Sequence, residues 1–295
     1  MTSFGRKVAS ARSLFEARGV IGVLEALSYQ APVQRLLATR RYVSPAFWRH
    51  WDNPVLGRFV ELRGNRARID GCTFTLDTPA IPTGLKALFL FDRYERAERD
   101  ALRRHLDASL PVVELGGSLG VVACITNRLL ANPMRHVVVE ANAAMLSVLE
   151  ENRRRNGCRF EVMHRAIGYG SPTVTFFEDD DFLSGSVLSG RAGYEGRPRR
   201  AVSVAAVSLR EIVDSHAFEQ CTLVCDIEGA ELGMVENEIV TLRERVNTII
   251  METHPGAVGA AAVQRMMEAL CSGGFKQIDG QAETVVLRNT SLAAA

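Results

Sequence analysis

Short apolar runs alternate with longer helical stretches from residue 111 onward, and this alternation is the strongest constraint on the fold. Strands that alternate with helices at this spacing predict a parallel sheet covered by helices on both faces. Only a few residues separate the last two runs, so we expect the final strand to lie antiparallel to its neighbour. The runs are 111–115, 136–140, 160–164, 222–226, 246–251, 275–278 and 284–287.

The residues before this region follow other patterns. Mixed helical spacings predict two or three short helices over 4–41, and alternation over 58–77 predicts a small antiparallel meander. A long irregular stretch at 178–200 predicts either a mobile flap or a fixed hairpin in which Phe182, Leu183 and Leu188 are buried. We expect three parts: an N-terminal helical and β-meander extension (1–84), a main domain (85–290) and a tail (291–295).

Charge and composition exclude several classes of protein. The 35 Lys and Arg residues nearly balance the 34 Asp and Glu residues, so the chain lacks the positive field needed to coat nucleic acid. The six cysteines form no Cys-x-x-Cys pair, which predicts reduced, buried thiols rather than a zinc site. The sequence has no membrane-length apolar run and no secretion signal near its start, so we expect a cytoplasmic protein without a nucleic-acid partner.

One local stretch allows a membrane interpretation. The range 40–51 combines several Arg residues with Tyr, Phe and two Trp residues. It either packs against the main domain or makes a peripheral contact with a membrane or glycolipid, because Trp and Arg together suit an interface.

A glycine-rich loop follows the first strand of the alternating region. The strand ends in an acid, Glu114, and the loop contains Gly116, Ser118 and Gly120. A dinucleotide fingerprint starting at Gly116 would need glycines where the chain has Ser118 and Val121, so NAD is disfavoured. An acid ahead of such a loop suits a cationic amino acid with an adenosine tail, which describes S-adenosylmethionine (SAM).

Further acids end the neighbouring strands. Glu140 ends the next apolar run, where a carboxylate can accept both ribose hydroxyls, although a helix cap or a solvated strand end would look the same. Three acids crowd the end of a later strand, and Glu252 and His254 end the strand after it. Because ligands of open α/β sheets bind at the carboxyl ends of the strands, we expect these segments to share one cleft.

The motifs at these strand ends resemble those of the FkbM family of SAM-dependent methyltransferases. The resemblance extends over about 94–287, and its most specific part is Asp-Ile-Glu-Gly-Ala-Glu at 226–231 followed by Glu-Thr-His at 252–254. Members commonly carry Lys where this chain has Val224. The family implies a class I Rossmann-like sheet of seven strands in the order 3-2-1-4-5-7-6. It also implies O-methylation of a hydroxyl on a small molecule or glycan, such as a sugar, glycolipid, polysaccharide or polyketide.

The resemblance also implies roles for single residues. The methionine end of SAM would be held by Glu114, Gly116, Ser118 and Gly120, and the ribose by Glu140. The adenine would be bordered by Asn142, Ala166 and Ile167. Glu95, Ala141 and Asp226 are added to the cofactor contacts, and Asp226 and Glu228 would face the reaction centre.

An alcohol acceptor must lose a proton, which calls for a base. His254 suits this role because a free imidazole titrates near neutrality, while Asp226 is the competing base and a purely structural His254 is the third interpretation. Mg²⁺ held by Asp226, Glu228, Glu252 and His254 would be another way to acidify the hydroxyl. A catalytically inactive SAM-binding module and an NAD-dependent oxidoreductase are the alternative functions.

Overall fold

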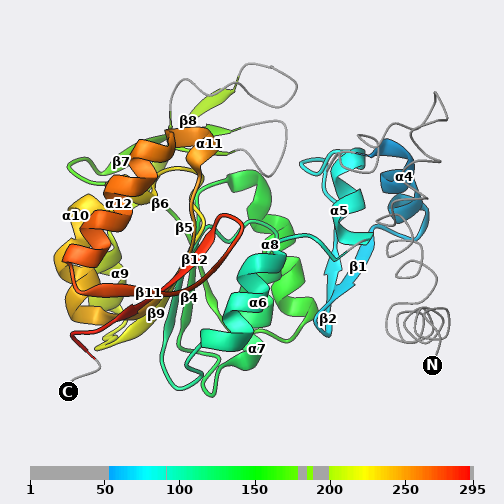
Figure 1. Cartoon of the computed structure of the whole chain (residues 1–295). Coiled ribbons are helices and arrows are strands. Elements are labelled where there is room, and N and C mark those ends of the chain that lie inside the picture. The colour runs from blue at the N-terminus through cyan, green and yellow to red at the C-terminus, as the bar shows by residue number, and fades with distance from the viewer. Residues whose placement is uncertain (1–52, 91, 179–184, 189–198, 293–295) are drawn as a thin grey trace, which may run out of the picture. The chain divides into compact units, whose positions relative to one another are not determined.

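The computed structural model describes residues 53–90, 92–178, 185–188 and 199–292. The chain divides into two compact units (Figure 1). The first unit ends at Ile69 and resumes over Ile81–Tyr94, and the second consists of Asp70–Ala80 and everything from Glu95 onward. The helices predicted over 4–41 and the aromatic stretch at 40–51 lie outside the described residues.

The described part of the first unit begins with a helix where the sequence predicted a strand. Helix α4 begins after Asn53, whose Oδ1 accepts a hydrogen bond from the Leu56 amide at 3.1 Å, and Pro54 occupies its first position. From this capped start the helix continues through the residues predicted as the first strand of the meander. The prediction of a strand there was therefore wrong. The other two predicted strands are present as β1 and β2. The bounds are α4 (Pro54–Leu62), β1 (Arg66–Ile69), a 3-10 helix η1 (Thr83–Lys86), α5 (Ala87–Leu90) and, in the second unit, β2 (Cys72–Thr75).

The second unit is built on a seven-stranded sheet whose order is β11-β12-β10-β9-β3-β4-β5. Numbered along the sheet's own strands, this is the predicted order 3-2-1-4-5-7-6. Strand β12 pairs antiparallel with β10 and β11, while the remaining neighbours are parallel, which confirms the predicted antiparallel end. The strands are β3 (Val112–Leu115), β4 (His136–Glu140), β5 (Glu161–His164), β9 (Cys221–Cys225), β10 (Val246–Glu252), β11 (Phe275–Gln281) and β12 (Thr284–Asn289).

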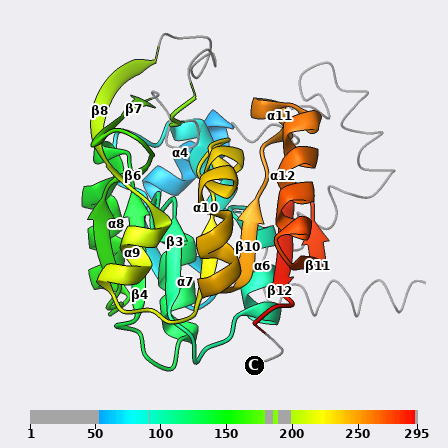
Figure 2. The ribbon, with the colours of Figure 1, turned by 90° about the vertical axis from the view of Figure 1, so that its left-hand side faces the viewer.

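Helices cover both faces of this sheet (Figure 2). Alternate side chains of the central strands point to opposite faces: Val113 packs in the core under α9, α10 and α12, whereas Val112 packs with residues of α6 and α7. The helices are α6 (Arg96–His105), α7 (Val121–Leu129), α8 (Ala143–Arg155), α9 (Leu209–Ser215), α10 (Glu231–Arg245), α11 (Pro255–Val258) and α12 (Ala260–Ser272).

A second, three-stranded sheet has the order β6-β8-β7. Its strands β6 (Ala166–Ile167), β7 (Thr173–Glu178) and β8 (Arg200–Val207) include the antiparallel hairpin predicted around the irregular stretch. Of the three side chains named for a fixed hairpin, Leu188 is half-buried, and Phe182 and Leu183 lie outside the described residues. Four of the six unpaired cysteines are buried, but Cys271 is exposed, contrary to expectation. None of the described helices is both long and apolar enough to span a membrane.

Candidate functional site

The acids singled out in the sequence lie along the carboxyl edge of the parallel strands. Glu114 lies in β3, Glu140 is the last residue of β4, and Glu252 is the last residue of β10. Asp226 directly follows β9, and its amide donates to the Leu115 carbonyl at 2.9 Å. The topology therefore brings the predicted segments together at one edge of the sheet.

The glycine loop, residues 116–120, connects β3 to α7. Gly116 has φ +94°, and a Cβ at this position would lie 1.8 Å from the Asp226 carbonyl oxygen. Gly120 has φ +78°, and its Cβ would lie 2.6 Å from the Leu149 side chain of α8. Both glycines are therefore required by the protein's own packing as well as by backbone conformation.

The side chain of Glu140, at the end of β4, is hydrogen-bonded to the glycine loop. It is 6 % exposed, and its Oε2 accepts a hydrogen bond from the Ser118 amide at 2.6 Å. Its Oε1 accepts from the Asn142 amide, also at 2.6 Å. Burial raises the pKa of Glu140, and these backbone hydrogen bonds partly offset that effect. Each oxygen keeps a second lone pair with which it can accept a ligand hydroxyl.

The cofactor contacts predicted after β4 and β5 lie in two different parts of the structure. Ala141 packs against the small apolar cluster that contains Ala166, Phe176 and Val204. Asn142 caps α8, because its Oδ1 accepts from the Ala144 amide at 3.0 Å. Ile167 belongs instead to the main core under the large sheet. The structure therefore brings Ala141 and Ala166 together, and it gives Ile167 a packing role.

Glu114 has a buried partner that sequence reasoning did not find. Its Oε2 lies 3.3 Å from Nε2 of His136, and both side chains are at most 1 % exposed. Burial lowers the pKa of His136 to about 3 and raises the pKa of Glu114 well above its usual value. Burial thus favours the uncharged form of both residues. The only signal in the sequence is that both residues lie in buried adjacent strands.

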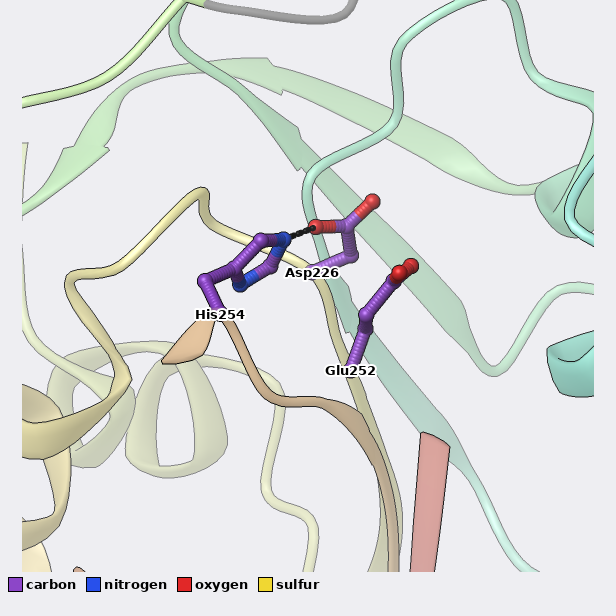
Figure 3. A group of neighbouring side chains, drawn as sticks. All are labelled: Asp226, Glu252 and His254. Atoms are coloured by element: carbon purple, nitrogen blue, oxygen red, sulfur yellow. Dashed lines mark ion pairs between the residues drawn. The ribbon is translucent and has the colours of Figure 1, made fainter. Parts of the chain in front are cut away.

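His254 lies among three carboxylates, of which Figure 3 shows Asp226 paired with the ring. Its Nε2 is 3.2 Å from Oδ1 of Asp226 and 3.8 Å from Oε2 of Glu228, and its Nδ1 is 3.0 Å from Oε1 of Glu231. Burial alone would lower the pKa of His254, but the contacts with Asp226 and Glu231 outweigh it and raise the pKa to about 11. His254 is therefore an imidazolium at neutral pH, and it has no lone pair with which to accept a proton.

Glu231 organises this cluster, although the sequence analysis gave it no role. It is 2 % exposed, begins α10, and its Oε1 accepts hydrogen bonds from the amides of Ile227 at 3.1 Å and Gly229 at 3.2 Å. Its position as the last acid of the Asp-Ile-Glu-Gly-Ala-Glu motif was the available signal. Glu231 holds the loop after β9 in shape and also faces the charged ring of His254.

Glu252, the last residue of β10, lies beside Asp226 and His254. Burial, with a further contribution from the charge of Asp226, raises the pKa of Glu252 to about 7. A carboxyl group of this kind exchanges its proton near neutral pH, which is the property of a general base. The sequence analysis considered Glu252 only as a metal ligand.

Among the residues that the structure describes, two groups of side chains have the spacing of a metal site. One ligand atom from each of Asp226, Glu252 and His254 lies within 4.8 Å of the others, and the same is true of Glu95, Glu98 and Asp226. Imidazole binds metals in its neutral form, whereas both ring nitrogens of His254 face carboxylates. The first group, which contains most of the predicted Mg²⁺ ligands, therefore fits a charge-paired cluster better than a metal centre.

A segment of the long irregular stretch at 178–200 is hydrogen-bonded to the loop after β9. The Ser186 hydroxyl, buried at 1 % exposure, donates to the Glu228 carbonyl at 2.9 Å and accepts from the Leu188 amide at 3.0 Å. The Arg199 guanidinium donates to the carbonyls of Leu188 and Phe177 at 3.1 and 2.8 Å. Within the predicted flap, the described residues 185–188 are thus fixed by hydrogen bonds, and the rest lies almost wholly outside the described residues.

Comparison with known proteins finds solved structures that align with part of this chain. No family model and no curated protein sequence matches the chain. Among solved structures, ribosomal protein L11 methylase from Lactobacillus delbrueckii subsp. bulgaricus aligns with a TM-score of 0.39 and 14 % identity, over 66 % of this chain and 77 % of that one. Aeropyrum pernix fibrillarin in complex with natively bound S-adenosyl-L-methionine aligns with a TM-score of 0.38 and 12 % identity, over 62 % and 68 % of the two chains.

A third structure, precorrin-6y C5,15-methyltransferase from Geobacter metallireducens GS-15, aligns with a TM-score of 0.38 and 13 % identity, over 64 % of this chain and 82 % of that one. The order and directions of the seven strands are defined by this chain's own hydrogen bonds. By that topology, the second unit has the Rossmann-like fold of class I methyltransferases.

Proposed function

We propose that the protein is a SAM-dependent O-methyltransferase of the FkbM type, which methylates a hydroxyl group of a small molecule or glycan. The observation that carries the proposal is Glu140, which joins the ends of two adjacent strands. Its carboxylate accepts from Ser118 in the glycine loop after β3 and from Asn142 after β4. An acid in this position, in a sheet of this order, is suited to the two ribose hydroxyls of an adenosine cofactor.

The residues around Glu140 fit SAM. The left-handed backbone at Gly116 and Gly120 turns the chain sharply between β3 and α7, as a loop that carries a ligand at the strand ends requires. Ala141 and Ala166 offer an apolar border for adenine. The carboxylates beyond the loop suit the cationic methionine end, with Glu95, Glu98 and Asp226 near one another. When bound, SAM supplies a methyl group already activated by a sulfonium.

We assign the proton transfer to Glu252 rather than to His254. In the proposed reaction the Glu252 carboxylate takes the proton of the acceptor hydroxyl while the hydroxyl oxygen forms its bond to the methyl carbon, and the carbon–sulfur bond breaks. The pKa of about 7 lets Glu252 hold that proton and release it between turnovers. His254 stays charged and balances Asp226, Glu228 and Glu231. Alignment of the reacting atoms at about 3 to 3.5 Å supplies much of the remaining acceleration.

Cofactor binding is the first test. Calorimetry and thermal shift with S-adenosylhomocysteine (SAH), the expected product, should give binding and a raised melting temperature, whereas NAD should give neither. The opposite preference would establish the oxidoreductase alternative. Cell extract incubated with methyl-labelled SAM should then yield a labelled product one CH₂ heavier by mass spectrometry. SAH binding without any labelled product across a broad panel of hydroxyl acceptors would favour the inactive module.

The role of Glu252 is tested by Glu252→Gln. We expect turnover to fall by about 10²- to 10⁴-fold while SAH affinity is retained. Because the fold favours the protonated form of Glu252, its charge destabilises the protein above pH 7 and not below pH 4.5. The variant should therefore be at least as stable as the wild type at pH 8. Glu236→Gln, on the exposed face of α10, is the control. Wild-type turnover in Glu252→Gln would refute the assignment.

A further inference from the structure

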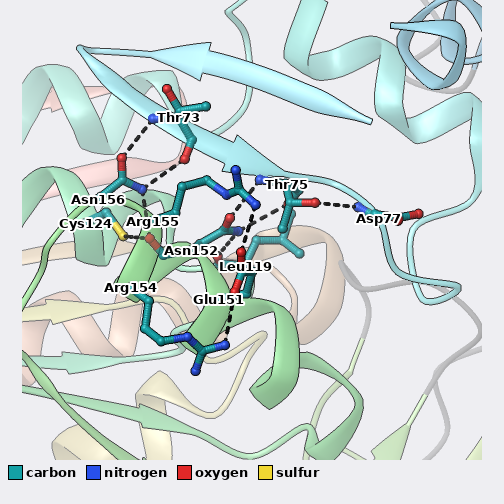
Figure 4. A network of polar contacts seen from close by, with 10 residues as sticks. All are labelled: Thr73, Thr75, Asp77, Leu119, Cys124, Glu151, Asn152, Arg154, Arg155 and Asn156. Atoms are coloured by element: carbon teal, nitrogen blue, oxygen red, sulfur yellow. Dashed lines mark hydrogen bonds and ion pairs between the residues drawn. The ribbon is translucent and has the colours of Figure 1, made fainter. Parts of the chain in front are cut away.

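Two asparagine side chains, one within helix α8 and one at its C-terminal cap, take the place of a neighbouring strand for β2 (Figure 4). Asn152 accepts from the Thr75 amide at 2.7 Å and donates to the Thr75 carbonyl at 3.2 Å. Asn156, which caps the end of α8, does the same with Thr73 at 2.8 and 3.0 Å. Each carboxamide thus forms the pair of hydrogen bonds that a peptide group of an adjacent strand would form.

The spacing of the two side chains explains why this arrangement works. Four residues of an α-helix rise about 6 Å, and two residues of a strand rise about 6.6 Å. Carboxamides four residues apart on a helix therefore match every second residue of a strand. Because a backbone amide only donates and a carbonyl only accepts, the orientation of both carboxamides is fixed by Thr73 and Thr75.

The two asparagines differ in their third hydrogen bond. Nδ2 of Asn152 also donates to the Leu119 carbonyl of the glycine loop at 2.9 Å. Nδ2 of Asn156 instead donates to the carbonyl of Asn152, within its own helix turn, at 2.8 Å. Only Asn152 therefore connects β2 with the glycine loop.

Asn152 is fully buried, at 0 % exposure, in a helix interior where asparagine is a poor helix former. Its burial is explained by the polar groups it satisfies, since an unpaired buried carbonyl is costly. Leu119 lies between Ser118, whose amide donates to Glu140, and Gly120, which precedes α7. Fixing the Leu119 carbonyl therefore fixes the peptide group between Leu119 and Gly120, at the end of the glycine loop where α7 begins.

We propose that Asn152 is a positioning residue for the glycine loop, and that through it cofactor binding and the attachment of β2 are coupled. The proposal rests on the proposed function, because the ligand of the loop is taken to be SAM. It assigns Asn152 no contact with the cofactor. Its effect passes through the Leu119 carbonyl, and Asn156 provides a matched residue that lacks this connection.

The experiment compares Asn152→Ala with Asn156→Ala. Each variant loses both hydrogen bonds to β2, and Asn152→Ala also leaves the buried Leu119 carbonyl unpaired, so its melting temperature should fall further. SAH affinity measured by calorimetry should weaken on the order of tenfold in Asn152→Ala and by less than about threefold in Asn156→Ala. Equal weakening in both variants, or none in either, would overturn the proposal.

Hydrogen exchange of the wild-type protein supplies a second test that needs no variant to fold. Saturation with SAH should slow exchange of the Thr75 amide, because ordering of the glycine loop tightens the Asn152 side chain. An exchange rate that does not change when SAH binds would refute the coupling. A wild-type protein that does not bind SAH at all would instead refute the proposed function, which separates the two failures.

Discussion

The two halves of the sheet's carboxyl edge satisfy their acids by different means. At the end of β4, both oxygens of Glu140 accept hydrogen bonds from backbone amides. Beyond β9 and β10, the carboxylates of Asp226, Glu228 and Glu231 face one charged side chain, His254. The first arrangement depends on the path of the main chain, and the second depends on the ionisation of a single ring.

Because of this difference, we expect the two halves to respond to different kinds of change. Backbone donors keep their polarity at any pH, so the Glu140 half responds mainly to substitutions that move the chain. The His254 half responds to pH and to the loss of one charge, because removing one partner of a half-buried ion cluster leaves the others unbalanced. The following predictions separate the two responses.

Gly116→Ala should have the largest effect. The added Cβ would meet the Asp226 carbonyl at 1.8 Å, and the residue would also keep an unfavourable φ of +94°. We expect a loss of more than about 4 kcal/mol in the free energy of unfolding and loss of SAH binding. Gly157→Ala is the control, because Gly157 also has positive φ, at +64°, but its Cβ would meet nothing within 4 Å. Equal losses in denaturant titrations would show that backbone strain, not crowding, governs the loop.

His254→Gln should come next, with a loss of about 3 kcal/mol at neutral pH or below. The folded protein raises the pKa of His254 from 6.5 to about 11, so the stabilisation is complete below pH 6.5 and disappears as the pH rises through 11. The difference in unfolding free energy between wild type and variant should shrink over that range. His216→Gln, whose carboxylate partner Glu161 is exposed, should change little. A turnover that rises with the titration of His254 near pH 6.5 would restore its role as the base.

Glu140→Gln should have a smaller effect on stability and should also weaken binding. The amide side chain keeps one accepting oxygen but turns an NH₂ group toward a backbone amide, so one charge-assisted hydrogen bond is lost. We expect SAH affinity to fall about tenfold to a hundredfold at a pH where the wild-type carboxyl group is ionised. Glu161→Gln is the control at an exposed position. Unchanged affinity by calorimetry would remove Glu140 from the binding site.

A chelator should have the smallest effect. Because His254 is engaged with carboxylates on both ring nitrogens, we expect EDTA to leave turnover within about twofold of its value and added Mg²⁺ to change it no further. Turnover abolished by EDTA and restored by Mg²⁺ would show that the carboxylates around Asp226 hold a cation. It would also transfer activation of the hydroxyl from Glu252 to the metal.

The sequence was sufficient for the parts of the structure that depend on local pattern. Apolar runs of strand length identified all seven strands of the main sheet, and the short separation of β11 and β12 fixed their antiparallel pairing. Strand ends meet at one edge in any parallel sheet, so the meeting of Glu140, Asp226 and Glu252 followed from topology.

Properties that depend on three-dimensional surroundings were not predictable from the chain. The charge of His254 depends on carboxylates from a loop and from the start of α10, which no spacing reveals. Asn152 and Asn156 have the spacing of a solvated helix face, and only the position of β2 shows that they are bonded to it. The prediction of a strand where α4 lies was a local error, since the Asn53 cap outweighs the short alternating pattern that follows.

The pairing of β10 has a consequence for how the protein is made. Strand β10 is fully apolar at its centre and lies between β9 and β12, but β12 follows it in the chain only after α11, α12 and β11. While a ribosome is still adding those residues, one edge of β10 has no partner. An open apolar edge pairs readily with other copies and leads to aggregation. Completion of this sheet must therefore await translation of Thr284–Asn289.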